Sequence, residues 1–199
     1  MLILMQKRLG LKSLRKVTIN YGDAQMNSEL SAMRNMELKL LIIEYNKASQ
    51  LDRSFSKTKL STQKKFEFRK KLINYCIELM EKADKGTLKN KEIRDKIKAL
   101  SCIDVKNISY GQAQKVINVS LKQYCFILGN ENLIKELDCP LDTTTMKGYK
   151  IKHKRMIDVT ETDYIKYQQI FEDENNGIRV LKDSKYDDMR IKEFIPYTK

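Results

Sequence analysis

The sequence predicts an all-α fold: a single compact helical domain of five to seven helices with irregular or short β-like termini. Two observations favour this class. Apolar residues recur in steps of three and four along most of the chain, and only 2 Pro and 7 Gly interrupt its 199 residues. Hydrophobic residues make up 41% of the chain and charged residues 33%, a composition that excludes a disordered protein.

Three helices are predicted in the first half of the chain, because each segment places its apolar residues along one side of a helix. The first covers 23–51 and has an inner face of Met26, Leu30, Met33, Met36, Leu40 and Ile43. The second covers 62–83 and has an inner face of Phe66, Leu72, Ile73, Cys76, Ile77, Leu79 and Met80. The third covers 90–100 and uses Ile93, Ile97 and Leu100.

The central element is a helix over 111–128, which is apolar nearly all round and stops at Gly129. A short helix is predicted over 131–137, before Pro140. Thr160 and Asp163 form the start signal of a last helix, which ends near Gly177 and turns Ile165, Tyr167, Ile170 and Phe171 inward. Residues 16–21 are the best strand candidate, residues 1–22 form a basic arm, and residues 178–199 form an irregular tail.

The basic charge is unevenly distributed along the chain. The net charge is +13, but residues 154–199 hold 9 basic and 10 acidic side chains, so the excess lies in residues 1–153. Residues 53–71 carry eight basic side chains against Glu67 alone, and residues 147–155 carry five. Such clusters are what binding to a phosphate backbone requires. The alternative is a solvated, lysine-rich surface.

We expect no metal, no cofactor and no membrane partner. Four separated cysteines, Cys76, Cys102, Cys125 and Cys139, form no close pair, and a single histidine cannot build a histidine-rich metal site. The four cysteines are interpreted as buried, reduced thiols of a cytoplasmic protein. The apolar runs fall far short of the roughly 20 residues that cross a bilayer.

A polar stripe marks the central helix. Lys115, Asn118 and Lys122 follow one another at helical spacing, and Gln114 adjoins them. A polar stripe on a central helix must meet water, a ligand or a buried partner.

This stripe resembles a motif of the helix-hairpin-helix DNA glycosylases of the endonuclease III type. Gly111, Ala113, Lys115 and Asn118 match the spacing of that family's hairpin, with alanine at the second glycine, and Leu141-Asp142-Thr143 stands for its V-D-T. The resemblance implies that Lys115 attacks the sugar C1′ as a Schiff-base nucleophile and that Asp142 assists as acid or base. The same segment also looks like an element of small uncharacterised bacterial proteins, in which Asp142 would only cap a helix.

We therefore predict a nucleic-acid-binding protein, without a choice between DNA and RNA. A glycosylase or lyase is the first alternative. A protein-interaction module, including a homo-oligomer that uses Met26, Met33 and Met36, is the second. Tyr149 is the expected base-stacking residue. The candidate nucleic-acid-binding residues are Lys57, Lys59, Lys64, Lys65, Arg69, Lys70, Lys71, Gly111, Gln114, Asn118, Lys122, Lys147, Tyr149, Lys150, Lys152, His153, Lys154 and Arg155.

Overall fold

The computed structural model describes residues 24–52, 60–129, 131–147, 149 and 155–183. Across these ranges the chain forms helices and turns and contains no strand, which confirms the all-α class. None of the helices in these ranges is long and apolar enough to span a bilayer. The strand predicted over 16–21, the 1–22 arm and residues 184–199 of the predicted tail lie outside the described residues.

The helices follow the predicted order. Their bounds are α2 Ala24–Lys47, a π-helical turn η1 at Ala48–Asp52, α4 Thr62–Asp84, α5 Asn90–Ser101, α6 Tyr110–Leu128, α7 Glu131–Ile134, a 3-10 turn η2 at Met156–Asp158 and α8 Glu161–Glu174. The main differences in length are at α2, which ends at Lys47 and gives way to η1 inside the predicted 23–51, at α7, which ends before the predicted 137, and at α8, which ends before Gly177.

Local capping explains where several helices begin and end. The side chains of Ser61, Ser109 and Thr160 accept hydrogen bonds from backbone N–H groups in the first turns of α4, α6 and α8. Ser109 and Gln112 complete a reciprocal capping box. Gly129 ends α6 with φ 66°, a left-handed conformation that favours glycine.

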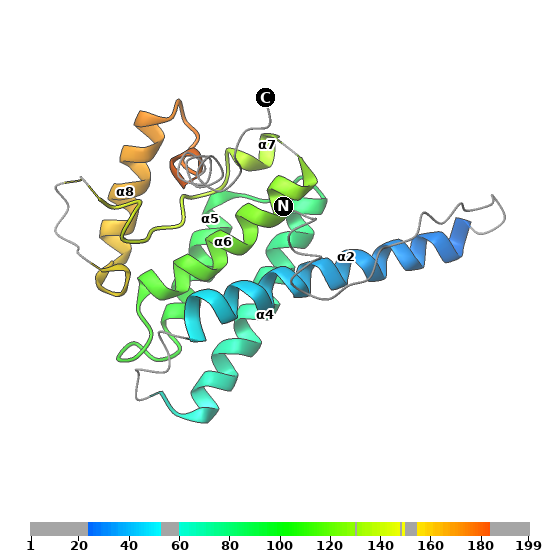
Figure 1. The fold of residues 1–199 in the computed structure, drawn as a ribbon, viewed down its shortest axis with the longest axis horizontal. Coiled ribbons are helices and arrows are strands. Elements are labelled where there is room, and N and C mark those ends of the chain that lie inside the picture. Colours follow the sequence, from blue (N-terminus) through cyan, green and yellow to red (C-terminus); the bar gives the residue numbers. More distant parts are fainter. Residues whose placement is uncertain (1–23, 53–59, 130, 148, 150–154, 184–199) are drawn as a thin grey trace, which may run out of the picture. The chain divides into compact units, whose positions relative to one another are not determined.

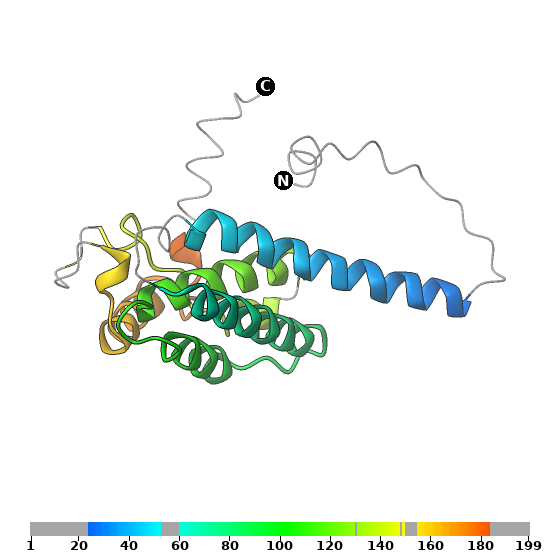
Figure 2. The same cartoon turned by 90° about the horizontal axis from the view of Figure 1, so that it is seen from below.

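The chain divides into two units, residues 1–36 and residues 37–199. In the second unit α6 is the central element, because it contacts α4, α5, α7, α8 and both short turns. Figures 1 and 2 show α4, α5 and α6 side by side in this unit. The enclosure of α6 is the feature that decides the environment of the predicted polar stripe.

Three predicted inner faces need correction. In α4, Phe66 is exposed and Phe68 is buried in its place. In α8, Ile165 is exposed, whereas Tyr164 and Gln168 join Tyr167 and Phe171 in the interior.

The stripe of α2 is the third correction. Leu30, Met33, Met36 and Leu40 are exposed, and the buried residues of its last turns are Lys39, Ile42, Ile43 and Asn46. The buried polar residues of α2 have partners within the second unit. Lys39 Nζ lies 2.6 Å from Asp84 Oδ2, and Asn46 donates to Ser120 and Gln123.

The start of the predicted tail is helical rather than irregular. The N–H groups of Leu181, Lys182 and Asp183 each donate to a carbonyl three residues earlier. Asp183 is buried, and its carboxylate lies 2.6 Å from Lys122 Nζ. This ion pair fixes the start of the tail to α6.

Candidate nucleic-acid interface

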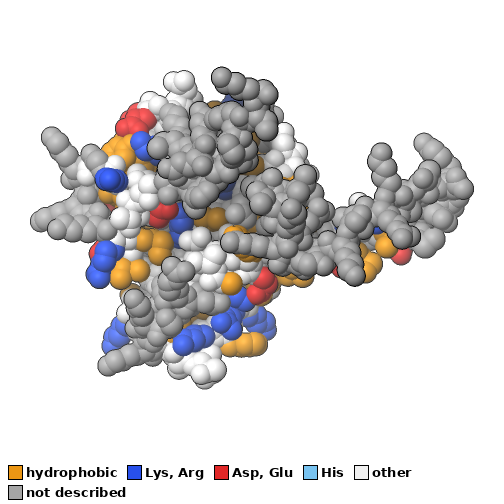
Figure 3. Space-filling model, viewed as in Figure 1, with side chains coloured by type: hydrophobic (Ala, Val, Ile, Leu, Met, Phe, Trp, Pro, Cys, Tyr) orange, Lys and Arg blue, Asp and Glu red, His pale blue; other side chains and the backbone are white. Residues whose placement is uncertain are grey.

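The first half of α4 carries the basic cluster that the sequence indicated. Phe68, Leu72 and Cys76 pack in the core, so the opposite side of the helix faces outward. Arg69 and Lys70 are exposed on this outer side, together with Phe66, whose side chain is 67% exposed. In Figure 3, Lys and Arg side chains gather with a hydrophobic one at the lower end of the view, where α4 begins.

One carboxylate serves this cluster. Glu67 lies 3.1 Å from Lys64 Nζ and 3.2 Å from Lys71 Nζ. Hydrogen bonds from Lys64, the larger cause, and from Lys71 lower the pKa of Glu67, although burial opposes the change. Within the described part of the chain, Lys65 and Lys70 form no ion pair with a carboxylate. The cluster therefore keeps a positive excess that faces solvent.

Both predicted clusters are only partly described. Lys57 and Lys59 of the first cluster and Lys150, Lys152, His153 and Lys154 of the second lie outside the described residues. Lys147 is exposed. Arg155 is exposed as well, but its guanidinium makes a two-pronged ion pair with Asp158 at 2.7 and 2.8 Å.

Tyr149, the expected stacking residue, is engaged within the protein. Its ring lies 5.5 Å from that of Phe171 and 6.1 Å from that of Tyr167, both at steep angles. Its hydroxyl donates to Glu174 and accepts from Lys182. Both the ring and the hydroxyl of Tyr149 thus serve the packing of α8. Phe66 is the most exposed aromatic side chain of the described residues.

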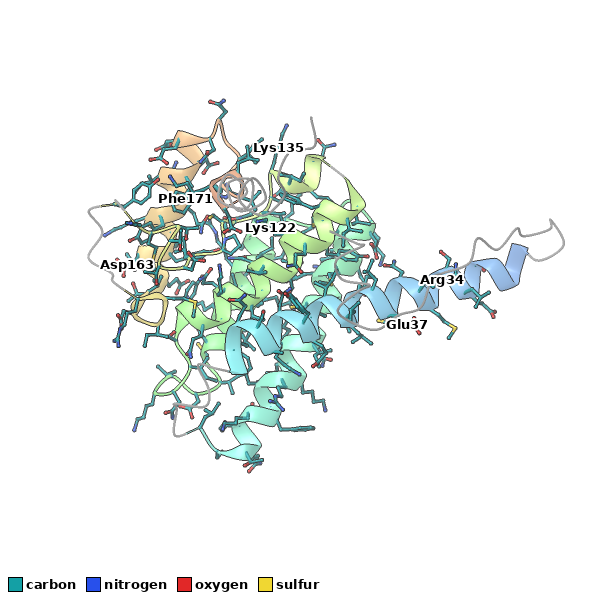
Figure 4. All side chains as sticks on the ribbon, in the orientation of Figure 1. Arg34, Glu37, Lys122, Lys135, Asp163 and Phe171 are labelled. Carbon is teal, nitrogen blue, oxygen red and sulfur yellow. The ribbon has the colours of Figure 1, made fainter. Side chains whose placement is uncertain are left out.

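The polar stripe of α6 faces the protein interior. Gln114, Lys115, Asn118 and Lys122 are all buried, which excludes solvent as their partner in this structure. Gln114 bridges to both backbone groups of Leu141, and Asn118 donates to Gln114 and to the Tyr164 hydroxyl. Figure 4 shows Lys122 on α6 and Phe171 on α8. The stripe therefore meets buried partners from the segments that enclose α6.

Lys115 and Asp142 are brought together. Lys115 Nζ lies 2.9 Å from Asp142 Oδ2, with the lysine buried and the carboxylate 32% exposed. Burial alone would raise the pKa of Asp142, but the Lys115 ammonium and the N–H groups of Thr145 and Thr144 outweigh it, so the pKa is lowered. Asp142 caps a turn over 143–147, and no helix begins there.

Gly111 is covered by η2. A Cβ added at Gly111 would lie 1.8 Å from the backbone oxygen of Met156 and 3.3 Å from Cβ of Val159. The first turn of α6 is thus in direct contact with another backbone segment. In the helix-hairpin-helix resemblance this glycine would approach a DNA phosphate, whereas here its neighbour is the protein itself.

Sequence reasoning missed a buried polar cluster around Asp138. This carboxylate accepts hydrogen bonds from Asn90, Arg94 and Tyr164 at 2.8 to 3.1 Å. Arg179 Nε lies 2.6 Å away, an ion pair without hydrogen-bond alignment. No sequence signal could have identified the cluster, because its members come from four separate segments.

Three of the four cysteines are buried, as predicted. Burial raises the pKa of both Cys76 and Cys125 to about 12, and it also raises that of Cys139. Cys102 is exposed at the end of α5, so the prediction of a buried thiol is wrong there.

No metal-binding arrangement is found among the described residues, where His, Cys, Asp and Glu do not gather in groups of three. No protein-family model, curated protein or solved structure matches this chain.

Proposed function

We propose that this protein binds nucleic acid through the first half of α4. The observation that carries the proposal is the outward face of this helix, where Arg69 and Lys70 are exposed beside Phe66, and the half-buried Lys65 precedes it in the chain. Each lysine that pairs with a phosphate releases condensed counterions, which makes the affinity depend on salt. The surface charge of the cluster, five basic side chains against Glu67, suits a polyanion.

A salt series with paired variants tests this proposal. Binding of a labelled oligonucleotide should weaken linearly on a plot of log affinity against log salt. Lys65→Gln/Lys70→Gln should reduce the slope by about 1.4 for a single strand. The control is Lys135→Gln/Lys166→Gln, because these two lysines are exposed elsewhere, after α7 and on α8. Equal slopes for both double variants would overturn the assignment of the site.

The pairing of Lys115 with Asp142 favours a second candidate, a glycosylase or lyase. The 2.9 Å contact supplies the amine and the carboxylate that such chemistry combines on one site. Borohydride should then trap a covalent adduct on abasic DNA, and Lys115→Gln should abolish it. Lys122→Gln is the matched control, since Lys122 is also buried on α6 and paired with a carboxylate. A trapped band that survives Lys115→Gln would exclude this lysine as nucleophile.

The exposed side chains of α2 favour a third candidate, a protein-interaction module. Met33 is 60% exposed, and Leu30, Met36 and Leu40 are exposed as well, whereas the Met26 side chain lies outside the described residues. Flexible methionines suit an adaptable contact surface. Sedimentation over a concentration range tests the homo-oligomer form, and a concentration-independent monomer would exclude it.

A further inference from the structure

Phe66 occupies a position that core packing does not explain. The neighbouring Phe68 is fully buried and fills the core side of α4, while Phe66 lies in solvent. A buried phenylalanine contributes roughly 1.5 to 3 kcal/mol relative to an exposed one. The fold gains little of this from Phe66, whose side chain is 67% exposed, so its ring is available to a partner.

The surroundings of Phe66 combine an aromatic face with positive charge. Arg69 and Lys70 follow it at i+3 and i+4, and Gln63 precedes it by three residues, so these side chains are its neighbours on the helix surface. All three neighbours are exposed. Glu67, the carboxylate in this segment, is occupied by Lys64 and Lys71. A fitting partner brings both a flat apolar surface and negative charge.

Single-stranded nucleic acid supplies both features. An unpaired base offers its π-face to an aromatic ring, and the adjoining phosphates meet the lysines. In a duplex the base faces are already stacked on one another, and an inserted side chain has to unstack them at a cost of a few kcal/mol per step. The ring therefore favours unpaired bases, whereas the lysines alone would not discriminate.

An anionic membrane surface fits the same site less well. Membrane-surface helices present an apolar face several residues wide. Around Phe66 the exposed positions are polar or charged, namely Thr62, Gln63, Arg69, Lys70 and Asn74.

We infer that Phe66 stacks on an unpaired base while Lys70, its neighbour on the helix surface, contacts a flanking phosphate, so that this face selects single-stranded over duplex nucleic acid. The inference rests on the proposed nucleic-acid-binding function and adds the class of ligand to it.

Substitutions of Phe66 test the stacking directly. With labelled single strands of about 16 nucleotides, Phe66→Ala should weaken binding by about 5- to 150-fold and leave duplex binding unchanged. Phe66→Tyr should keep the affinity, because the ring remains. Phe66→Leu is the matched control, since leucine keeps an apolar side chain but removes the π-face. Full affinity in Phe66→Leu would mean an apolar contact rather than stacking.

A fluorescent variant gives a second readout. The chain contains no tryptophan, so Phe66→Trp introduces a unique indole at the site. Stacking on a base should quench its emission with the single strand and leave it unchanged with the duplex. A blue shift with anionic phosphatidylserine vesicles and no quenching by the oligonucleotide would overturn the inference in favour of a membrane.

The failures of the two proposals are distinguishable. If the unsubstituted protein binds neither the single strand nor the duplex at low salt, the proposed function fails and the inference fails with it. If salt-sensitive binding persists but Phe66→Ala affects single strand and duplex equally, or neither, only the stacking inference is overturned.

Discussion

Lys115 Nζ lies 2.9 Å from Asp142 Oδ2, although the two residues are 27 positions apart in the chain. The pair joins the second turn of α6 to the turn over 143–147, and the carboxylate also accepts hydrogen bonds from two backbone N–H groups of that turn. This arrangement depends on ionised Asp142 and therefore on pH.

Asp142→Asn should destabilise the protein by about 2 kcal/mol at neutral pH, a value below that of a fully buried pair because the carboxylate is partly exposed. The folded-state pKa of Asp142 lies below the unfolded value of about 3.9. Its contribution to stability is thus present above that value and lost as the pH falls through the folded pKa. Urea unfolding at pH 7 and near pH 3 measures this, and a gap between the two proteins that stays constant with pH would contradict it.

Asp138 should be among the carboxylates to which stability is most sensitive. Asp138→Ala leaves the Arg94 and Arg179 guanidinium groups without their shared buried partner, and we expect a loss of about 3 to 5 kcal/mol. Asp95→Ala is the control, because Asp95 is exposed on α5 beside Arg94 and should change stability by less than about 0.5 kcal/mol. Urea midpoints compare the variants, with Asp138→Asn as a milder substitution if the alanine variant does not fold. Similar midpoints for Asp138→Ala and Asp95→Ala would show that the cluster adds little.

Gly111→Ala should reverse the usual effect of this substitution in a helix. Alanine ordinarily stabilises a helix interior by about 1 kcal/mol relative to glycine. Here the new Cβ would lie 1.8 Å from the Met156 oxygen, so α6 and η2 must separate, and a loss of about 1 to 3 kcal/mol follows.

The control for Gly111→Ala is Gly86→Ala. Gly86 has φ 67° and open space around an added Cβ, so alanine there meets backbone strain alone, at about 1 to 2 kcal/mol. The Tm values of the two variants compare the effect of backbone strain alone, at Gly86, with the effect of the contact between the added Cβ and Met156, at Gly111. An unchanged or higher Tm for Gly111→Ala would mean that η2 moves aside freely.

One of the four thiols should react fast, and the other three should react slowly. Cys102 is exposed, whereas burial raises the pKa of Cys76 and Cys125 to about 12 and so disfavours their thiolates. A disulfide reagent at pH 8 should label one thiol rapidly in the native protein and all 4 in denaturant. Cys102→Ser should remove the fast phase, and a fast phase that remains would place another thiol at the surface.

Local signals in the sequence determined the helices. Thr160 caps the start of α8 and Gly129 caps the end of α6, and both caps could be predicted because capping involves only neighbouring residues in the sequence. The apolar spacing also placed α5 with its buried Ile93, Ile97 and Leu100, since its apolar residues define one clear face.

The tertiary structure alone decided which polar groups face the interior and which apolar groups do not. Phe66 and Phe68 are two positions apart and equally apolar, and only the neighbours of α4 select Phe68 for the core. Lys39 and Lys122 are lysines like any others in the sequence, yet each is buried because a distant carboxylate, Asp84 or Asp183, compensates its charge. Burial is a property of what packs against a residue, and contacts between residues far apart in the chain leave no local pattern from which to predict it.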